Sequence, residues 1–326
     1  MADWLAANAL ALLIAMALDA RFGEPDWLWR RLPHPVVAIG DFIGWMDNRF
    51  NAGTPSQRLW SGRLCLVLLL ASVGVSVGLV TVLALALHWL AGVMLSALVG
   101  AVFLAQRSLF NHVHAVAVPL ASGDLPSARQ TLGLIVGRQT GTLDESGIAR
   151  AALESLAENH SDGVIAPAFW LLIGGAPGIA LYKAINTADS MIGYRTERHL
   201  DFGAASARLD DVVNWLPARL SVGLIALGAL IARMPTPSWV VVASGAPTHA
   251  SPNAGWPETA YASVLGIALG GPRTYASHRV EAPYLNHQGR NDLVAGDISR
   301  GLKLFRSTCL AMALAIAIVL GITLVF

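Results

Sequence analysis

The sequence predicts an all-α, polytopic integral membrane protein with about four to six hydrophobic helices, some of them re-entrant, plus helical and loop segments in the cytoplasm. Hydrophobic residue types make up 55% of the 326 residues and charged types only 13%, whereas soluble proteins carry roughly 25% charged residues. Several uncharged runs are long enough to cross a bilayer. The 22 basic and 21 acidic residues leave a net charge of +1. Because this balance offers no attractive field for a polyanion, we expect no nucleic-acid partner.

The first apolar run, residues 4–18, predicts a retained membrane helix. No basic residue precedes it, and Arg21, Arg30 and Arg31 follow it. A cleavable signal peptide shows the opposite arrangement, with basic residues ahead of the apolar core. The positive-inside rule therefore places the C-terminal flank of this helix in the cytoplasm.

Three further spans are predicted from uncharged stretches. Residues 64–106 form the longest of them, about twice the roughly 20 residues that one spanning helix needs. His88 and Gly92 mark the turn in this stretch, which therefore predicts a helical hairpin. Residues 307–326 are also uncharged and predict the last span.

Two other apolar runs allow either of two arrangements. Residues 164–182 are interrupted by Gly-Gly-Ala-Pro-Gly at 174–178, which predicts a broken or re-entrant segment whose freed backbone groups face protein or water. Residues 216–232 carry Arg219 one turn inside their start. Each run either spans the membrane or packs as a hydrophobic hairpin on one side.

The distribution of basic residues bears on this choice. They occur in all four polar stretches, 19–63, 107–163, 183–215 and 233–306. If both doubtful runs span, the stretch 183–215 lies outside; if neither spans fully, all four stretches lie in the cytoplasm. We favour the second arrangement because it keeps the polar motifs on one side. A single integral membrane domain over residues 1–326 is the simplest prediction.

The first polar cluster contains three carboxylates. Glu154, Glu158 and Asp162 recur at a spacing of four, so one helix would place them along one face. Like charges at this spacing repel, and Mg²⁺ or a cationic group would convert the repulsion into affinity. The alternative is a solvated helix face with basic partners elsewhere.

The second cluster mixes basic groups with small polar ones. Arg195 and Arg198 are three residues apart, the spacing of two guanidinium groups that hold one phosphate or carboxylate. The alternative is a juxtamembrane helix whose basic residues lie at lipid headgroups. The other polar members of this cluster are Lys183, Asn186, Thr187, Asp189 and Ser190.

The third cluster, Asp210-Asp211-x-x-Asn214, is of a type that holds Mg²⁺ against a diphosphate. The alternative is that Asp210 or Asp211 caps the helix that follows. No G-x-x-x-x-G-K-[ST] and no G-x-G-x-x-G after a strand-like run occurs, so ATP would not be held by a P-loop and no Rossmann fingerprint is present.

These clusters belong to a longer ordered set of motifs. The motifs are Asp19-x-x-x-Gly23-Glu24-Pro25, His34-Pro35-Val36, Glu154-Ser155-x-x-Glu158-Asn159-x-x-Asp162-Gly163, Tyr182-Lys183-x-x-Asn186-Thr187-x-Asp189-Ser190-Met191, Gly193-Tyr194-Arg195, Arg208-x-Asp210-Asp211-x-x-Asn214-Trp215 and Ser251-Pro252-Asn253-Ala254-Gly255-Trp256-Pro257. Together they resemble the CobD/CbiB family of cobalamin-biosynthesis proteins, the adenosylcobinamide-phosphate synthases.

The resemblance implies an ATP-dependent ligase that forms an amide bond. It implies the substrates adenosylcobyric acid and (R)-1-aminopropan-2-ol or its O-phosphate, with ATP as co-substrate and Mg²⁺. It also implies a place in the bacterial cytoplasmic membrane with the active site facing the cytoplasm. A homo-oligomer, or a complex with other late cobalamin-pathway enzymes, stays open.

An amine does not displace oxide from a carboxylate, so we expect ATP to form an acyl phosphate first. Such a site needs metal ligands, cations against the phosphate and a base for the ammonium. As catalytic residues we assign Glu154, Glu158, Asp162, Lys183 and Asp189, with Lys183 binding phosphate. As Mg²⁺ ligands we assign Glu158, Asp162, Asp210 and Asp211. For substrate and phosphate binding we assign Asn159, Asn186, Thr187, Ser190, Arg195, Arg198, Arg208, Asn214 and Asn253.

Two other classes remain as alternatives. An intramembrane Mg²⁺-dependent prenyltransferase would carry two spaced Asp-rich motifs on facing helices, and only the motif at 210–214 approaches that pattern. A non-enzymatic membrane sensor or transporter would need no ATP, and its polar clusters would line a path across the bilayer.

Overall fold

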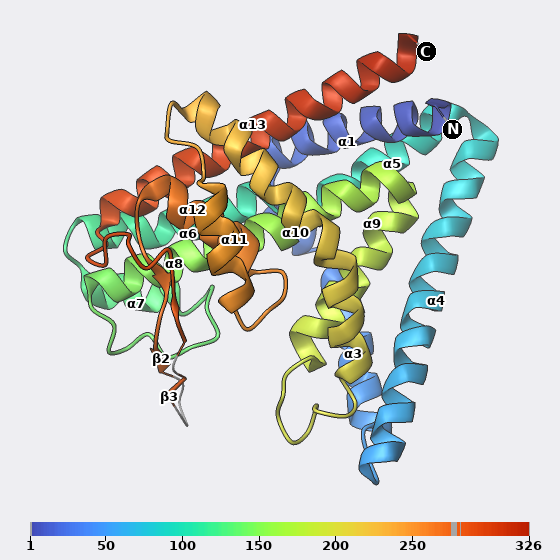
Figure 1. The fold of residues 1–326 in the computed structure, drawn as a ribbon. Helices are drawn as coiled ribbons and strands as arrows, with labels where there is room; N and C mark the ends of the chain where they lie inside the picture. Colours follow the sequence, from blue (N-terminus) through green and yellow to red (C-terminus); the bar gives the residue numbers. More distant parts are fainter. Residues whose placement is uncertain (1, 275–278, 281, 326) are drawn as a thin grey trace. The chain divides into compact units, whose positions relative to one another are not determined.

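Helices form nearly all of the regular structure (Figure 1). The computed structural model describes residues 2–274, 279–280 and 282–325. Its α-helices are α1 (Ala2–Phe22), α2 (Asp26–Trp29), α3 (Pro35–Phe50), α4 (Pro55–Leu87), α5 (Trp89–Phe103), α6 (Gln106–Ala121), α7 (Leu125–Leu132), α8 (Glu145–His160), α9 (Ala166–Ile192), α10 (Ala204–Ala232), α11 (Trp239–Gly245), α12 (Gly255–Leu265) and α13 (Ala295–Val325). A π-helical turn η1 (Ser161–Ile165) joins α8 to α9, and a 3₁₀ turn η2 (Ala246–Thr248) follows α11.

The strands of the described chain are two residues long each and do not change the fold class. β1 (Leu269–Gly270) pairs antiparallel with β4 (Tyr284–Leu285). β2 (Arg273–Thr274) pairs antiparallel with β3 (Arg279–Val280). The all-α prediction is therefore confirmed.

The chain divides into two compact units. The first unit comprises Met1–Ala105, Ala166–Asn214 and Ile316–Phe326, and the second comprises Gln106–Ile165 and Trp215–Ala315. Each is described by itself below. The single integral membrane domain expected over residues 1–326 stays a prediction.

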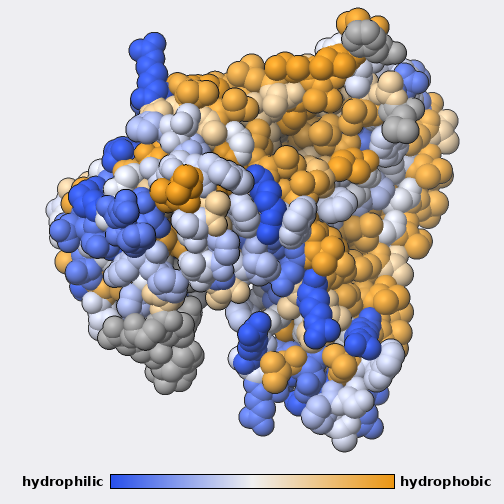
Figure 2. Space-filling view, in the orientation of Figure 1, coloured by the Kyte–Doolittle hydropathy of each residue, from blue (hydrophilic) through white to orange (hydrophobic). Residues whose placement is uncertain are grey.

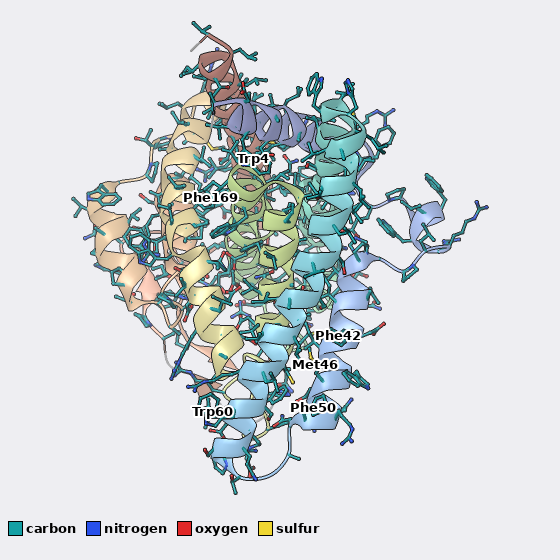
Figure 3. All side chains as sticks on the ribbon, turned by 90° about the vertical axis from the view of Figure 1, so that its right-hand side faces the viewer. Trp4, Phe42, Met46, Phe50, Trp60 and Phe169 are labelled. Carbon is teal, nitrogen blue, oxygen red and sulfur yellow. The ribbon has the colours of Figure 1, made fainter. Side chains whose placement is uncertain are left out.

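The first unit is built around the predicted hairpin and α9. His88 ends α4 and caps the start of α5, where its side chain accepts a hydrogen bond from the Leu90 N–H at 3.2 Å. This confirms the turn expected at that residue. α9 packs against α1, α3, α4 and α5. Met46 of α3 (Figure 3) belongs to a core that also includes Cys65 of α4 and Ala184 of α9.

α9 is broken at Gly175, as the Gly/Pro-rich run predicts. Gly175 has φ 61° and ψ −154°, outside the helical region. Pro177 has no N–H, so the Ile173 carbonyl lacks its usual helical donor. The Trp4 Nε1–H donates to that carbonyl at 3.0 Å, and the Asn8 amide donates to the Leu172 carbonyl at 3.2 Å. Side chains of α1 thus satisfy the carbonyls that the break frees, and Trp4 lies at this end of the unit (Figure 3).

Replacing Gly175 by alanine should destabilise the protein, because this backbone conformation is essentially confined to glycine. We expect Gly175→Ala to lower the free energy of unfolding by about 1–3 kcal/mol. A Cβ there would also lie 3.3 Å from the Asn8 Oδ1 atom, whereas a Cβ on Gly174 would meet nothing within 4 Å. Thermal unfolding in detergent of Gly175→Ala and the control Gly174→Ala measures this. Equal midpoints for the two variants would contradict it.

The second unit contains α6, α7, α8, α11, α12, the short strands, the part of α10 from Trp215 onward and the part of α13 up to Ala315. α6 packs on α7 and α8, and α12 packs on α8 and α11. β1 also packs against α8. These contacts bury most of α8, which carries two of the three carboxylates of the first predicted cluster.

Six segments of the described chain are long and apolar enough to cross a membrane: Ala2–Phe22, Pro55–Leu87, Trp89–Ala121, Glu145–Ile192, Ala204–Ala232 and Ala295–Val325. Only 17% of the most apolar window of α4 is buried, and Figure 2 shows hydrophobic surface over the flank that α4 occupies in Figure 1. Apolar surface of that extent requires a lipid solvent. The protein is therefore a multi-pass membrane protein, and the four predicted spans are helices.

The two doubtful runs also lie within candidate spans. The run 164–182 falls in Glu145–Ile192, and the run 216–232 forms the second half of α10. α10 begins at Ala204, well ahead of its apolar part. Asp210 and Asp211 are consequently inside a helix, and the alternative that either of them caps it is wrong.

Candidate functional site

A buried hydrogen-bonded network joins α9 to α10 in the first unit. The Tyr182 hydroxyl donates to the Asn214 Oδ1 atom at 2.9 Å, and the Asn214 amide donates to the Asp210 Oδ2 atom at 2.9 Å. The Asn186 amide reaches the Asp210 Oδ1 atom at 3.4 Å. Tyr182 and Asn214 are each 1% exposed and Asp210 is 8% exposed. The carboxylate is therefore held by two amide donors largely out of solvent.

Helical spacing explains how the chain builds this network. Tyr182 and Asn186 are four residues apart on α9, and Asp210 and Asn214 are four apart on α10, so each pair lies on one helix face. The tyrosine fixes the orientation of the Asn214 amide, because a hydroxyl donor at Oδ1 turns the NH₂ group toward Asp210. This places donors, rather than a second acceptor, against the buried carboxylate.

Two more carboxylates and a cation lie beside the network. Asp189 interacts electrostatically with Asp210 and Asp211, and Arg195 attracts Asp211. Three acidic groups held this close repel one another unless a cation joins them. Ligand ammonium groups and Mg²⁺ are the cations that such oxygen-rich sites accept.

The donor set fits Mg²⁺ held jointly with a substrate. Mg²⁺ in phosphoryl-transfer sites usually binds one or two carboxylates, substrate phosphates and water. Asp210 and Asp211 can supply the carboxylates. Across the ranges that the structure describes, no group of three or more His, Cys, Asp or Glu side chains could hold a metal ion by itself.

Three other predicted residues, Thr187, Ser190 and Arg208, do not take part in the buried network. The Thr187 hydroxyl donates to the Lys183 carbonyl at 2.6 Å, and the Ser190 hydroxyl donates to the Asn186 carbonyl at 2.8 Å. Both hydroxyls therefore bond to their own helix. Arg208 is exposed on α10.

Arg198 forms an ion pair with α3. Its Nη2 and Nε atoms lie 2.6 Å and 3.0 Å from the Asp47 Oδ2 atom. Asn51 and His199 also donate to this carboxylate, at 2.7 Å and 3.4 Å. Arg198 and Arg195 are thus engaged by different carboxylates, and the structure does not bring them together on one anion as their spacing predicted.

The Asp47 carboxylate is more acidic than usual. Burial alone would raise its pKa, but the hydrogen bonds from Asn51, Arg198 and His199 outweigh burial, so the pKa of Asp47 is lowered. A lowered pKa in the folded state means that ionised Asp47 stabilises the fold.

We therefore expect a pH-dependent stability difference between the wild type and Asp47→Asn. The difference should be fully present above the ordinary aspartate pKa of about 3.9 and should disappear as the pH falls through the lower folded-state value. Thermal midpoints in detergent between neutral and acidic pH measure it. Asp41→Asn, an exposed position on the same helix, serves as the control. A difference that is constant with pH would contradict the expectation.

Glu154 is engaged within the second unit. Its Oε2 atom lies 2.8 Å from the Arg138 Nη2 atom, and its Oε1 atom accepts a hydrogen bond from the Gly270 N–H at 2.7 Å. Glu154 is 5% exposed. Arg138 is thus a basic partner for the first cluster that residue spacing could not identify.

The three carboxylates of this cluster do not share one α-helical face. Glu154 and Glu158 lie on α8, whereas Asp162 lies in the π-helical turn η1. A π turn contains more residues than an α turn, so it shifts Asp162 away from the stripe that a spacing of four predicts. Glu158 is exposed and Asp162 is partly buried.

The two predicted asparagines of the second unit have local partners. The Asn159 amide donates to the Ser155 carbonyl at 2.9 Å. The Asn253 Oδ1 atom accepts from the Arg219 Nη1 atom at 2.8 Å. The Arg219 guanidinium also lies over the rings of Trp215 and Trp256, so Asn253 forms part of an arginine–tryptophan contact.

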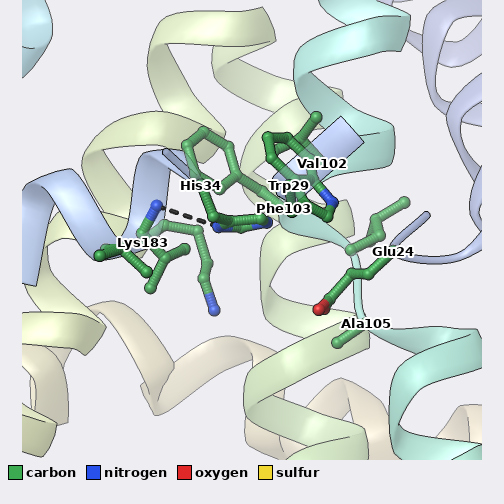
Figure 4. A pocket seen from close by; sticks show the side chains of 10 residues that line it. Glu24, Trp29, His34, Val102, Phe103, Ala105 and Lys183 are labelled. Carbon is green, nitrogen blue, oxygen red and sulfur yellow. Dashed lines mark hydrogen bonds between the residues drawn. The ribbon is translucent and has the colours of Figure 1, made fainter. Parts of the chain in front are cut away.

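A pocket of about 410 Å³ in the first unit contains polar residues to which the sequence assigned no role (Figure 4). Its polar lining comes from Glu24, Trp29, His34 and Lys183. Of these, only Lys183 was predicted as a site residue. The motifs Gly23-Glu24-Pro25 and His34-Pro35-Val36 were the available signal, but spacing alone does not place them beside α9.

Fold and site define a polytopic membrane protein with a buried cluster of carboxylate and amide side chains. The family described as "CobD/Cbib protein" matches residues 12–305, and the chain belongs to this family. Family membership implies a role in cobalamin biosynthesis.

Similar proteins of known name support the same assignment. The chain is 44% identical over 320 residues to the cobalamin biosynthesis protein CobD of Brucella anthropi, covering 97% of each chain. It is 46% identical over 316 residues to that of Rhodobacter capsulatus, covering 95% of this chain and 97% of the relative. For the protein of Sinorhizobium fredii the identity is 44% over 312 residues, covering 95% and 96%. No solved structure matches.

Proposed function

We propose that this protein is an ATP-dependent ligase that joins adenosylcobyric acid to (R)-1-aminopropan-2-ol or its O-phosphate through an amide bond. The observation that carries the proposal is the match to the cobalamin-biosynthesis family over residues 12–305. The buried carboxylate–amide network of α9 and α10 supports it, because charged groups inside a membrane protein generally serve function.

The carboxylate of adenosylcobyric acid must be activated before the amine can attack it. One carboxylate oxygen of adenosylcobyric acid attacks the γ-phosphorus of ATP, which releases ADP and forms an acyl phosphate. The amine then attacks the acyl carbon, the C–O bond to phosphate breaks, and inorganic phosphate leaves. Mg²⁺, when bound with ATP, neutralises charge on the transferring phosphoryl group.

We assign to the network the roles that its geometry supports. Asp210 and Asp211 would hold Mg²⁺, with the Asp189 carboxylate beside them. Asn186 and Asn214 orient Asp210 through their amide hydrogen bonds. In the second unit, Glu158 and Asp162 stay candidates for metal or base chemistry.

Product formation by the purified protein tests this function. The full-length protein in detergent is incubated with adenosylcobyric acid, MgATP and each amine, and the corrinoids are analysed by mass spectrometry. We expect a product whose mass corresponds to the amide, with one ADP released per amide formed. If the folded protein neither hydrolyses ATP nor consumes adenosylcobyric acid, the result would instead favour a sensor or transporter.

We also propose that the protein lies in the bacterial cytoplasmic membrane with the polar stretches facing the cytoplasm. Single cysteines at Glu197 and His287, both exposed, test this after Cys65 and Cys309 are replaced by alanine. The stretch containing His287 is cytoplasmic in both arrangements considered, so it is the control. An impermeant maleimide should label both cysteines only in inside-out vesicles. Labelling of the Glu197 position in right-side-out vesicles would overturn the arrangement.

A further inference from the structure

The pocket in the first unit contains two buried N–H donors, on Trp29 and His34, that have no hydrogen-bond partner in the described part of the chain. It is lined at its polar side by Glu24, Trp29, His34 and Lys183 and elsewhere by apolar residues, including Phe103 (Figure 4). Its volume of about 410 Å³ is in the range of small-molecule sites. The pocket is therefore sized for a small ligand or for one end of a larger one.

The tautomer of His34 is set by the helix that it caps. Its Nδ1 atom accepts a hydrogen bond from the Val36 N–H at 3.2 Å at the start of α3. Burial lowers the pKa of His34; Glu24 opposes this shift and Lys183 adds to it. The neutral imidazole has one N–H, and because Nδ1 is the acceptor, Nε2 carries it. This Nε2 atom is buried and has no hydrogen-bond partner within the described part of the chain.

Trp29 presents a second donor of the same kind. Its indole nitrogen is a donor only, and Nε1 is also buried without a partner among the residues that the structure describes. The Trp29 ring packs edge-on against His34, with 4.3 Å between ring centroids. A buried donor without an acceptor destabilises the fold. A ligand bound in the pocket would satisfy both donors by supplying the acceptors.

Charged groups lie on either side of these donors. Lys183 and Glu24 both interact electrostatically with His34, and Figure 4 shows them on opposite sides of it. Two neutral N–H donors with an ammonium match the peripheral oxygens of a phosphoryl group. The Glu24 carboxylate favours a ligand that carries a cation beside its phosphoryl group.

We propose that the pocket formed by Trp29, His34 and Lys183 is a binding site for the phosphoryl group of a small ligand. This inference rests on the proposed function, in which two ligands carry such a group: the amine, when it is phosphorylated, and ATP. Glu24 lies where the ammonium of an amine phosphate would be attracted, so the amine phosphate fits the charges of the pocket more fully.

Binding without turnover tests the proposal. Equilibrium dialysis of the full-length protein, with no corrinoid present, measures Kd for 1-aminopropan-2-ol O-phosphate, for free 1-aminopropan-2-ol and for AMP-PNP with Mg²⁺. Trp29→Phe removes one N–H and keeps most of the ring, and His34→Asn keeps a side chain that caps helices well. Trp27→Phe is the matched control, because Trp27 lies on the same short helix and is 67% exposed.

We expect Trp29→Phe and His34→Asn each to raise the Kd of one phosphoryl ligand about tenfold or more, because each variant loses one hydrogen bond to a charged group. Trp27→Phe should leave every Kd unchanged. A loss confined to the amine phosphate assigns the pocket to the amine, and a loss confined to AMP-PNP assigns it to the nucleotide. Both results support a phosphoryl site.

Three results would overturn the proposal. The wild type could bind neither phosphoryl ligand at millimolar concentration, the two variants could bind both as the wild type does, or free aminopropanol could lose as much affinity as its phosphate. Because the binding experiment involves no turnover, it tests the phosphoryl site separately from the proposed ligase function. A protein that ligates while the variants bind normally refutes the pocket alone, and one that forms no amide but shows the binding pattern refutes the ligase alone.

Discussion

Replacing Asp210 by asparagine should lower the rate of amide formation by about 100-fold or more, the effect typical of losing a group that acts in the transition state. The substitution keeps the size of the side chain and removes its charge. Asp210 is the buried centre of the α9–α10 network, where amide groups of Asn186 and Asn214 approach its two oxygens. The measurement is the initial rate of amide formation at saturating MgATP and both substrates.

Two controls separate lost chemistry from lost folding. Asp41→Asn removes an exposed carboxylate from the same unit and should keep the wild-type rate. Tyr182→Phe removes only the hydroxyl that orients Asn214, and we expect it to lower the rate less than Asp210→Asn. A folded Asp210→Asn variant with wild-type turnover would remove Asp210 from the reaction.

Breaking the ion pair between Arg138 and Glu154 should have the largest effect on stability. Both side chains are nearly buried, with 12% and 7% exposed, and the charged atoms are 2.8 Å apart. Removal of one member of a buried pair leaves the other charge uncompensated and costs about 3–5 kcal/mol. Glu154→Gln also places an amide NH₂ opposite the guanidinium. We therefore expect this variant to unfold at a clearly lower temperature.

A double-mutant cycle measures the pair itself. Arg138→Gln should destabilise about as much as Glu154→Gln, and the double variant should lose less than the sum of the two. Glu145→Gln, an exposed position on the same helix, should change the free energy of unfolding by less than about 0.5 kcal/mol. If Glu154→Gln keeps its stability and loses turnover, Glu154 acts in catalysis, as we assign it from the sequence.

Local patterns were sufficient for much of the fold. The turn at His88 follows from a polar residue inside a long apolar run, and the break at Gly175 follows from the density of glycine and proline around it. The start of α10 at Ala204 was missed, because the apolar pattern begins only later in that helix. The π turn at Ser161–Ile165 was missed as well, since no residue spacing distinguishes it from an α-helix.

The sequence predicts the residues of the buried α9–α10 network as members of polar clusters, but it does not predict the contacts between them. Asn186, Asp189, Asp210, Asp211 and Asn214 were all expected in polar clusters, and the structure brings them together. Their arrangement depends on which faces of α9 and α10 meet, which the spacing on either helix does not specify.

Arg198 and Glu154 each bind a partner that is distant in sequence, so the sequence pattern did not predict their contacts. Arg198 pairs with Asp47, 151 residues away, and Glu154 accepts a hydrogen bond from Gly270, 116 residues away. Periodicity along a helix contains no information about such contacts.

Transfer of an oxygen isotope tests the proposed reaction most directly. Adenosylcobyric acid labelled with ¹⁸O in both oxygens of the reacting carboxylate is converted with unlabelled ATP in unlabelled water. An acyl phosphate requires that one labelled oxygen leave with the phosphate and that the other stay in the amide carbonyl. We predict one ¹⁸O atom in the inorganic phosphate for each amide formed. Amide formation with unlabelled phosphate would contradict the proposed mechanism.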